Sequence, residues 1–348
     1  MDSMDMLKAL SLHKAVSGNE STMCGYIESI FGEYCDSVET DRFYNVAGFK
    51  KGLSGKTKIM VTAHYDEIGF LVSGIDEKGF IKFSTIGGID SKILLAQEVV
   101  IHGKREVFGI IGAKPPHLLK PEEAKKAVKL DDLVIDAGLT AERAKESISI
   151  GDTITFAAVP FELQNSKLSS KSLDNRAGVA VLAELLKELK ELRHEADVYV
   201  VATTQEEVGL RGAEISAYNL SPDLAVVIDG CHGEIPDAPK GEAYPLGKGP
   251  AIAIGPNLHR KFTNKAIAVA KDENVPYQID TEPGDTGTEA WAIQVSRQGI
   301  PTVLLSVPVK YMHTTIETVH LKDIKNTARL ASKLIKGIQD ELEGLLCY

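Results

Sequence analysis

The chain has 348 residues, which is long for one compact core and favours one large domain with a smaller one. Its hydrophobic content of 43% and charged content of 25% are typical of a soluble globular protein. The formal net charge of -10 argues against a broad nucleic-acid-binding surface and against attachment to an anionic membrane.

The cysteines and the N-terminal segment point to the cytoplasm. Cys24, Cys35, Cys231 and Cys347 form no CxxC pair and no dense framework, as expected for reduced thiols. The first residues lack a basic region followed by a long apolar segment, so we expect no signal peptide. No apolar run approaches the roughly 20 residues that span a bilayer.

The first 69 residues contain the first candidate site. Apolar residues at three- and four-residue spacings predict helices within 3–35, with a turn at 17–20. The run KIMVTA (58–63) predicts a buried strand that ends at His64. Residues two apart on a strand face the same side, so the Asp66 carboxylate can orient the His64 ring. Carboxylates orient histidine ligands in this way in many metal sites. The alternative is a histidine that a nearby acid satisfies without any metal.

The sequence pattern between residues 70 and 161 differs from that of the first 69 residues. Short strands alternate with glycine-bearing turns, as in a small barrel or sandwich, and predict an inserted all-β domain. Residues 1–69 and 162–348 then form the α/β catalytic domain. His102 and His117 are isolated within the insertion, and we expect surface or hydrogen-bonded roles for them.

Candidate catalytic residues reappear after residue 161. Asp174 and Asn175 are expected to cap the helical pattern AGVAVLAELLKELKEL, so an N-cap is the alternative to a metal-binding role for Asp174. The run 198–203 predicts a buried strand that leads into Glu206 and Glu207. Adjacent acids repel each other, so a cation is expected to hold them, unless they lie in a solvated loop.

The C-terminal third repeats this pattern. A strand at 223–228 ends at Asp229, and a strand at 300–309 leads to His313. Between them lie a loop rich in glycine and proline and the glycine-rich turn 282–289. That turn lacks the spacing of the common phosphate-binding motifs, so backbone positioning beside the site is its expected role. A closing helix is predicted from 321 to 345.

The alternation of strands and helices predicts an α/β sheet covered by helices, with ligands bound beyond the carboxyl ends of the strands. Histidine and carboxylate ligands without thiolate suit Zn²⁺, Co²⁺ or Mn²⁺. Five residues exceed the needs of one tetrahedral ion but suffice for two ions that share a carboxylate, roughly 3.5–4 Å apart. These residues are His64, Asp174, Glu207, Asp229 and His313. Such ions activate a bridging water, and Glu206 is then free to act as general base.

The sequence resembles the M42 metallo-aminopeptidases of the MH clan, which include the glutamyl, leucyl and deblocking enzymes that build tetrahedral TET particles. Five motifs carry the resemblance, in the family's order: AHYDEIG (63–69), SLDNRAG (172–178), TTQEEVGLRGA (203–213), VIDG (227–230) and YMHTTIE (311–317). The resemblance implies a mixed sheet with helices on both faces, a PDZ-like dimerisation domain in place of the β insertion, and dodecamers.

Site roles follow from the same resemblance. It implies that His64, Asp174 and Asp229 bind one metal ion and that Asp174, Glu207 and His313 bind the other, so that Asp174 is the bridge. Glu206 would be the general base, and Asp66 would orient His64. The expected activity is removal of N-terminal residues from peptides, with two Zn or Co ions as cofactors.

Two residues depart from the family pattern. Glu289 stands where relatives commonly have Asp, which is expected to reshape the pocket wall, and Gly230 follows Asp229 where relatives often have a bulkier residue. Two other functions compete with a peptidase. A glycoside hydrolase would use paired carboxylates but would not need His64 and His313. A non-catalytic scaffold would be expected to lack Glu206 or a metal ligand.

Overall fold

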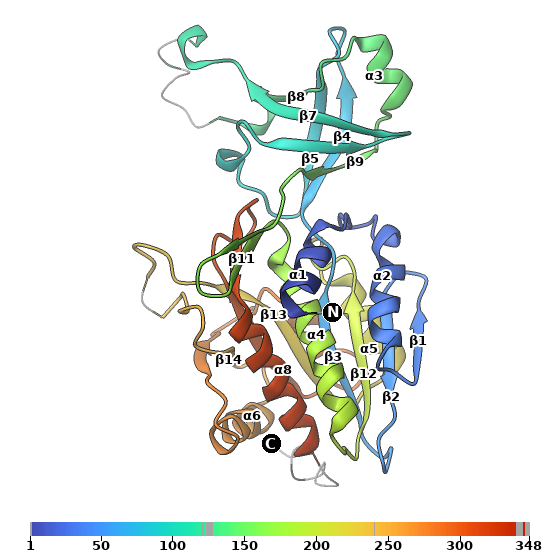
Figure 1. Cartoon of the computed structure of the whole chain (residues 1–348), viewed down its shortest axis with the longest axis vertical. Coiled ribbons are helices and arrows are strands. Elements are labelled where there is room, and N and C mark those ends of the chain that lie inside the picture. The colour runs from blue at the N-terminus through green and yellow to red at the C-terminus, as the bar shows by residue number, and fades with distance from the viewer. Residues whose placement is uncertain (1, 120–121, 123–127, 240, 339–343, 345–348) are drawn as a thin grey trace.

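A mixed sheet of eight strands forms the centre of the larger part of the molecule (Figure 1). The computed structural model describes residues 2–119, 122, 128–239, 241–338 and 344. Four central strands, β12, β3, β13 and β16, run parallel, and the outer pairs add antiparallel neighbours. In sheet order the strands are β1 (Ser37–Thr40), β2 (Val46–Lys50), β12 (Asp197–Thr203), β3 (Lys58–His64), β13 (Leu224–His232), β16 (Thr302–Val309), β14 (Ala251–Ile254) and β15 (Gln278–Thr281).

Helices cover both faces of this sheet because the central strands are apolar on both sides. Leu224, Val226 and Ile228 of β13 pack into one core, whereas Ala225 and Val227 pack into the other. The first face carries α1 (Ser3–Leu12), α2 (Ser21–Gly32), α4 (Leu173–Glu191), α6 (Arg260–Asp272) and α8 (Leu321–Lys336). The second carries α5 (Arg211–Leu220) and α7 (Ala290–Ile293). The α/β prediction is confirmed.

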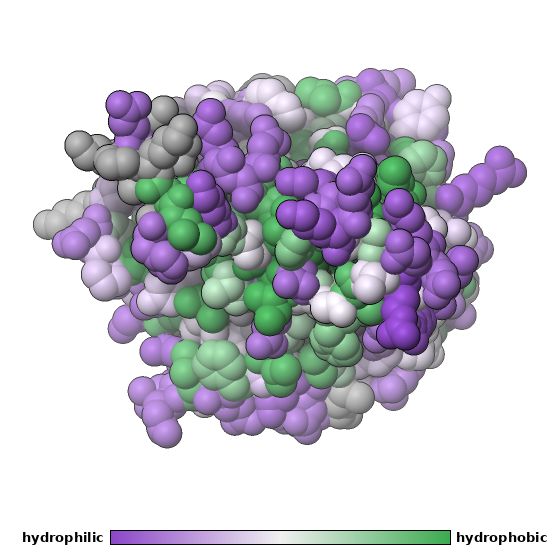
Figure 2. Space-filling model, turned by 90° about the horizontal axis from the view of Figure 1, so that it is seen from above, coloured by the Kyte–Doolittle hydropathy of each residue, from purple (hydrophilic) through white to green (hydrophobic). Residues whose placement is uncertain are grey.

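A closed six-stranded barrel stands at one end of the molecule (Figure 1). Phe70 anchors its separate core through edge contacts with Phe83 and Phe156. The strands in barrel order are β4 (Gly69–Ile75), β5 (Ile81–Ile86), β8 (Leu133–Asp136), β7 (Glu106–Ala113), β6 (Glu98–His102) and β9 (Thr153–Phe156). From this end, hydrophilic and hydrophobic residues are interspersed on the surface (Figure 2).

The insertion is not all-β as predicted, because it also contains the helix α3 (Ala141–Ser147). Thr140 caps this helix by accepting a hydrogen bond from the backbone N–H of Arg143. Three short 3₁₀ turns, Ser91–Ile93, Pro116–Leu118 and Leu130–Asp132, complete the connections. A helix of seven residues is too short for its periodicity to stand out among strands of similar length.

A three-stranded antiparallel sheet was not predicted. It consists of β10 (Phe161–Leu163), β11 (Lys167–Ser170) and β17 (Glu317–His320). Strands of three or four residues carry little alternation, which explains the omission. The predicted closing helix ends earlier, at Lys336, and residues 339–343 and 345 of that prediction lie outside the described residues.

Three of the four cysteines, Cys24, Cys35 and Cys231, are free thiols, as predicted. Cys347 lies outside the described residues. Among the helices of the described chain, none has both the length and the apolar character needed to cross a membrane.

Candidate metal centre

The predicted site residues lie together at the carboxyl ends of the central strands. Thr203 of β12 is paired with His64 of β3, so Glu206 and Glu207, which follow β12, emerge beside that histidine. Asp229 lies in β13, next to β16, which leads to His313. One cavity of about 1230 Å³ is lined by His64, Asp174, Glu206, Glu207, Asp229 and His313.

The start of α4 turns Asp174 toward the cavity. Its φ of -83° and ψ of 105° are not helical, and its peptide bond to Asn175 is cis. Asn175 caps the regular helix instead, since its Oδ1 accepts the backbone N–H of Gly178 at 2.9 Å. The alternative of Asp174 as the N-cap is therefore wrong, and its carboxylate is available for another partner.

Asp174 lies between the two histidines. Its Oδ1 is 3.4 Å from His64 Nε2, and its Oδ2 is 3.6 Å from His313 Nε2. Asp229 Oδ1 is 3.7 Å from His64 Nε2, and Glu207 Oε2 is 3.6 Å from His313 Nε2. Ligand atoms around a tetrahedral zinc, with bonds of about 2.0–2.1 Å, lie about 3.3 Å apart. These four histidine-to-carboxylate distances are therefore within a few tenths of an ångström of those around a bound ion.

Two groups of three ligand atoms, each within 4.8 Å of one another, match the expected pair of sites: His64 with Asp174 and Asp229, and Asp174 with Glu207 and His313. Asp174 belongs to both. A third group of the same kind joins His64, Glu206 and Glu207, so Glu206 also lies within reach of an ion. The Oδ2 atom of Asp229 is buried without a hydrogen-bond partner, as a metal ligand would be in a protein without its metal.

The charges of the site fit cations. Burial raises the pKa of Glu206 most, and the carboxylates of Asp229 and Glu207 raise it further against the opposing effect of His64. Burial likewise raises the pKa of Asp229. The described residues that line the cavity include no Lys or Arg. At Glu206 and Asp229, burial and the neighbouring carboxylates outweigh the opposing charge of His64, and two divalent ions would supply further positive charge.

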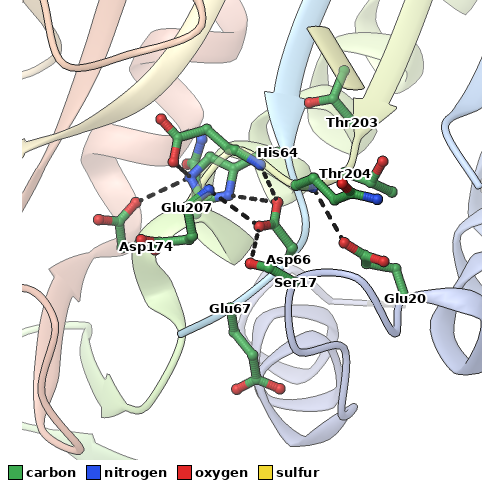
Figure 3. Close-up of polar contacts among 12 residues, drawn as sticks. Ser17, Glu20, His64, Asp66, Glu67, Asp174, Thr203, Thr204 and Glu207 are labelled. Carbon is green, nitrogen blue, oxygen red and sulfur yellow. Dashed lines mark hydrogen bonds and ion pairs between the residues drawn. The ribbon is translucent and has the colours of Figure 1, made fainter. Parts of the chain in front are cut away.

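Asp66 is buried and contacts two of the candidate ligands, His64 and Glu207, and the candidate base Glu206 (Figure 3). Its Oδ1 lies 3.4 Å from His64 Nδ1, an ion-pair distance that lacks hydrogen-bond alignment. The same carboxylate accepts the backbone N–H groups of Glu206 at 3.0 Å and Glu207 at 3.2 Å, and the Ser17 hydroxyl at 2.5 Å. Asp66 therefore holds the segment after β12 as well as facing His64.

Residues outside the predicted set also support the site. His313 Nδ1 lies 2.7 Å from the Gly88 carbonyl oxygen, which assigns the proton to Nδ1 and leaves Nε2 free for a ligand role. Glu317 accepts the backbone N–H of His313 at 2.7 Å. A Cβ at Gly230 would lie 3.0 Å from Met312 Cε and 3.3 Å from Asp174 Oδ1, so a larger residue would crowd the site.

The expected effect of Glu289 on the pocket wall is wrong. Its side chain is buried at 1% exposure and accepts a hydrogen bond from the Thr203 hydroxyl, while Thr288 lines the cavity. His102 contacts Thr155 at 2.9 Å within the barrel, in line with the hydrogen-bonded role expected for it.

A family model described as M42 glutamyl aminopeptidase matches residues 45–330. The chain belongs to the M42 aminopeptidase family. A lysyl aminopeptidase of Pyrococcus furiosus is 34% identical, over 96% of this chain and 97% of that protein.

Solved structures of M42 relatives have the same fold. An aminopeptidase from the archaeon Desulfurococcus kamchatkensis is 36% identical with a TM-score of 0.93, over 99% of this chain and 98% of the other. The Pyrococcus horikoshii TET1 peptidase, described as assembling into a tetrahedron or a large octahedral shell, is 32% identical with a TM-score of 0.85, over 97% and 100%. The chain is an aminopeptidase, so the predicted family and reaction class are confirmed.

Proposed function

We propose that this aminopeptidase uses two divalent metal ions held by five side chains. His64, Asp174 and Asp229 hold one ion, and Asp174, Glu207 and His313 hold the other. The observation that carries the proposal is the position of Asp174, whose two oxygens lie 3.4 and 3.6 Å from the Nε2 atoms of different histidines. A carboxylate between two histidines is the arrangement that a bridging ligand requires.

Glu206 is proposed as the general base. When bound, two such ions supply positive charge that polarises a peptide carbonyl and lowers the pKa of a water. Glu206 removes a proton from the attacking water, whose oxygen forms a bond to the carbonyl carbon. As the C–N bond breaks, the protonated Glu206 passes its proton to the leaving amine. Its Oε2 is 3.9 Å from His64 Nε2, within the cavity that the substrate would enter.

The ligand atoms suggest which metal binds. Two imidazole nitrogens and three carboxylates without thiolate suit Zn²⁺ or Co²⁺, and also Mn²⁺, better than Mg²⁺ or Ca²⁺. The Cys231 thiol follows Asp229 closely in the chain but belongs to none of the described ligand groups. We therefore propose zinc or cobalt as the cofactor.

The barrel is proposed to join subunits. Residues 70–161 would be a PDZ-like dimerisation domain, inserted into a catalytic domain of residues 1–69 and 162–348. Phe108 and Ile110 alternate outward along β7 and are 69% and 55% exposed, which suits a contact between copies. TET1 relatives are described as a dodecamer and as a tetrahedron or large octahedral shell, and on that basis we propose that dimers of this chain build a tetrahedral dodecamer. The free thiols of the described cysteines suit an enzyme of the cytoplasm.

The two competing functions fit the cavity less well. Sugar-binding sites are usually rich in aromatic side chains, but the described lining includes one phenyl or indole-type ring, that of Tyr244. Paired carboxylates alone would leave His64 and His313 without a role. A non-catalytic scaffold would not need to retain all five ligands together with Glu206.

Metal removal combined with a substrate assay tests the proposal. Chelator-treated protein should lose hydrolysis of aminoacyl-p-nitroanilides, and added Zn²⁺ or Co²⁺ should restore it. Metal analysis of the restored protein should give two ions per chain. A metal-loaded protein that is inert to every aminoacyl substrate but cleaves β-glucan would overturn the assignment.

A further inference from the structure

Glu317 connects two candidate metal ligands that are far apart in the sequence. Its side chain is buried, at 2% exposure, in β17. Oε1 accepts the backbone N–H of His313 at 2.7 Å, and Oε2 accepts that of Asp174 at 2.9 Å. Each carboxylate oxygen thus holds the backbone of one residue from the ligand group that also includes Glu207.

The two segments that Glu317 holds have unusual backbone conformations. His313 has a φ of 61° and Tyr311 a φ of 56°, and Ser172, before Asp174, has a φ of 59°. Such values are unfavourable for residues other than glycine, so surrounding contacts must hold these segments in place. The pairing of β17 with β11 places Glu317 opposite Ser170, just before the segment that leads to Asp174.

Asp66 provides a comparison within the same site. Its two oxygens accept the backbone N–H groups of Glu206 and Glu207, the two adjacent acidic residues of the site. Asp66 and Glu317 are 0% and 2% exposed. Two buried carboxylates therefore hold the backbone of the site through hydrogen bonds. Asp66 holds the segment after β12, and Glu317 holds Asp174 and His313.

We propose that Glu317 is a positioning residue that sets Asp174 and His313 for the ion they share with Glu207. This inference rests on the proposed two-metal function. Partners that orient metal ligands typically change metal affinity by about 10–100-fold when they are replaced. A purely structural Glu317 would change stability without changing the binding of one particular ion.

Two substitutions and a matched control separate these roles. Glu317→Gln keeps the size of the side chain but turns an amide N–H₂ toward one backbone N–H, so one hydrogen bond is lost. Glu317→Asp keeps the charge and shortens the reach. The control is Asp323→Asn, because Asp323 is also fully buried and its two oxygens accept the backbone N–H groups of Gly247 at 2.6 Å and Gly249 at 2.8 Å, outside the cavity lining.

Metal-free full-length protein should be titrated with Co²⁺, with calorimetry reporting the affinity of each ion. Wild type and Asp323→Asn should each bind two ions, and for each ion the affinities of the two proteins should agree within about threefold. Glu317→Gln should bind one of its two ions about 10–100-fold more weakly than wild type binds that ion. Glu317→Asp should lie between them. Thermal unfolding of the metal-free proteins should show similar destabilisation in Glu317→Gln and Asp323→Asn.

Three results would overturn the inference: folded Glu317 variants that bind both ions as wild type does, equal weakening in Asp323→Asn, or failure of both Glu317 variants to fold, which would make Glu317 a folding residue. A wild-type chain that binds fewer than two ions would instead contradict the proposed function.

Discussion

Glu206→Gln is expected to separate proton transfer from metal binding. Glutamine has nearly the same shape, and the Glu206 side chain is only 11% exposed, so the variant should fill the same space. Burial and the charges of Asp229 and Glu207 raise the pKa of Glu206, so a neutral side chain there removes repulsion and should not destabilise the metal-free fold. What glutamine cannot do is accept a proton.

The size of the effect follows from that loss. A positioned general base contributes about 10²–10⁴-fold, or about 3–5 kcal/mol in the activation barrier. We therefore expect kcat for an aminoacyl-p-nitroanilide to fall by that factor, while KM changes by less than about threefold and both ions stay bound.

Glu207→Gln is the matched control, because it changes the adjacent residue of the same segment. Glu207 Oε2 lies 3.6 Å from His313 Nε2 in the second ligand group, so this variant should lose metal as well as activity. Metal content by mass spectrometry, measured beside the kinetics, distinguishes the two. Loss of both ions in Glu206→Gln would make Glu206 a ligand, as the third ligand group permits, and an unchanged kcat would exclude it as the base.

Three further outcomes are expected. Burial raises the pKa of Glu20 from its ordinary value to about 7, so the contribution of Glu20 to stability is present at low pH and is lost as the pH rises through about 7. In urea unfolding, the free energy of unfolding of Glu20→Gln should equal that of wild type at pH 5 and should exceed it by on the order of 2 kcal/mol at pH 8. A variant that is less stable than wild type at pH 8 would contradict this. Asp280 and Glu282 line a cavity whose described residues include no Lys or Arg. We therefore expect kcat/KM to be at least about tenfold higher for substrates with N-terminal lysine than for those with N-terminal glutamate, and Glu282→Gln should reduce this ratio. A higher kcat/KM for glutamate would refute the reasoning. Phe108→Asp should dissociate the assembly, as measured by light scattering. Leu53→Asp is the control: Leu53 lies between β2 and β3 and is equally exposed, at 69%, but its replacement should leave the assembly intact. An intact Phe108→Asp assembly would exclude a subunit contact through Phe108 of the barrel.

The strand ends were predictable from the sequence because local pattern and parallel topology determine them. An apolar run that gives way to a polar residue at His64 or Asp229 marks where a buried strand reaches the site, although β13 itself continues to His232, and parallel strands bring such positions together. The alternation in β13 follows the same rule, with Val226 on one face and Val227 on the other. The pattern of each strand is a short-range feature of the sequence.

The supporting contacts were not predictable in the same way. Glu317 binds the backbone of Asp174, 143 residues away, and no local pattern reports such a pairing. The sequence predicts both Asp174 and Asn175 as caps of α4, since both residue types are good caps, and the backbone conformation decides that only Asn175 takes this role. The burial of Glu289 likewise depends on Thr203 from a distant strand.

Diffraction from crystals of the Zn²⁺-loaded protein, with data at the zinc absorption edge, tests the two-metal site most directly. The account predicts two anomalous peaks about 3.5–4 Å apart, with one oxygen of Asp174 bonded to each at about 2.0–2.2 Å and Glu206 bonded to neither. A single peak, or two peaks that Asp174 does not bridge, would contradict it.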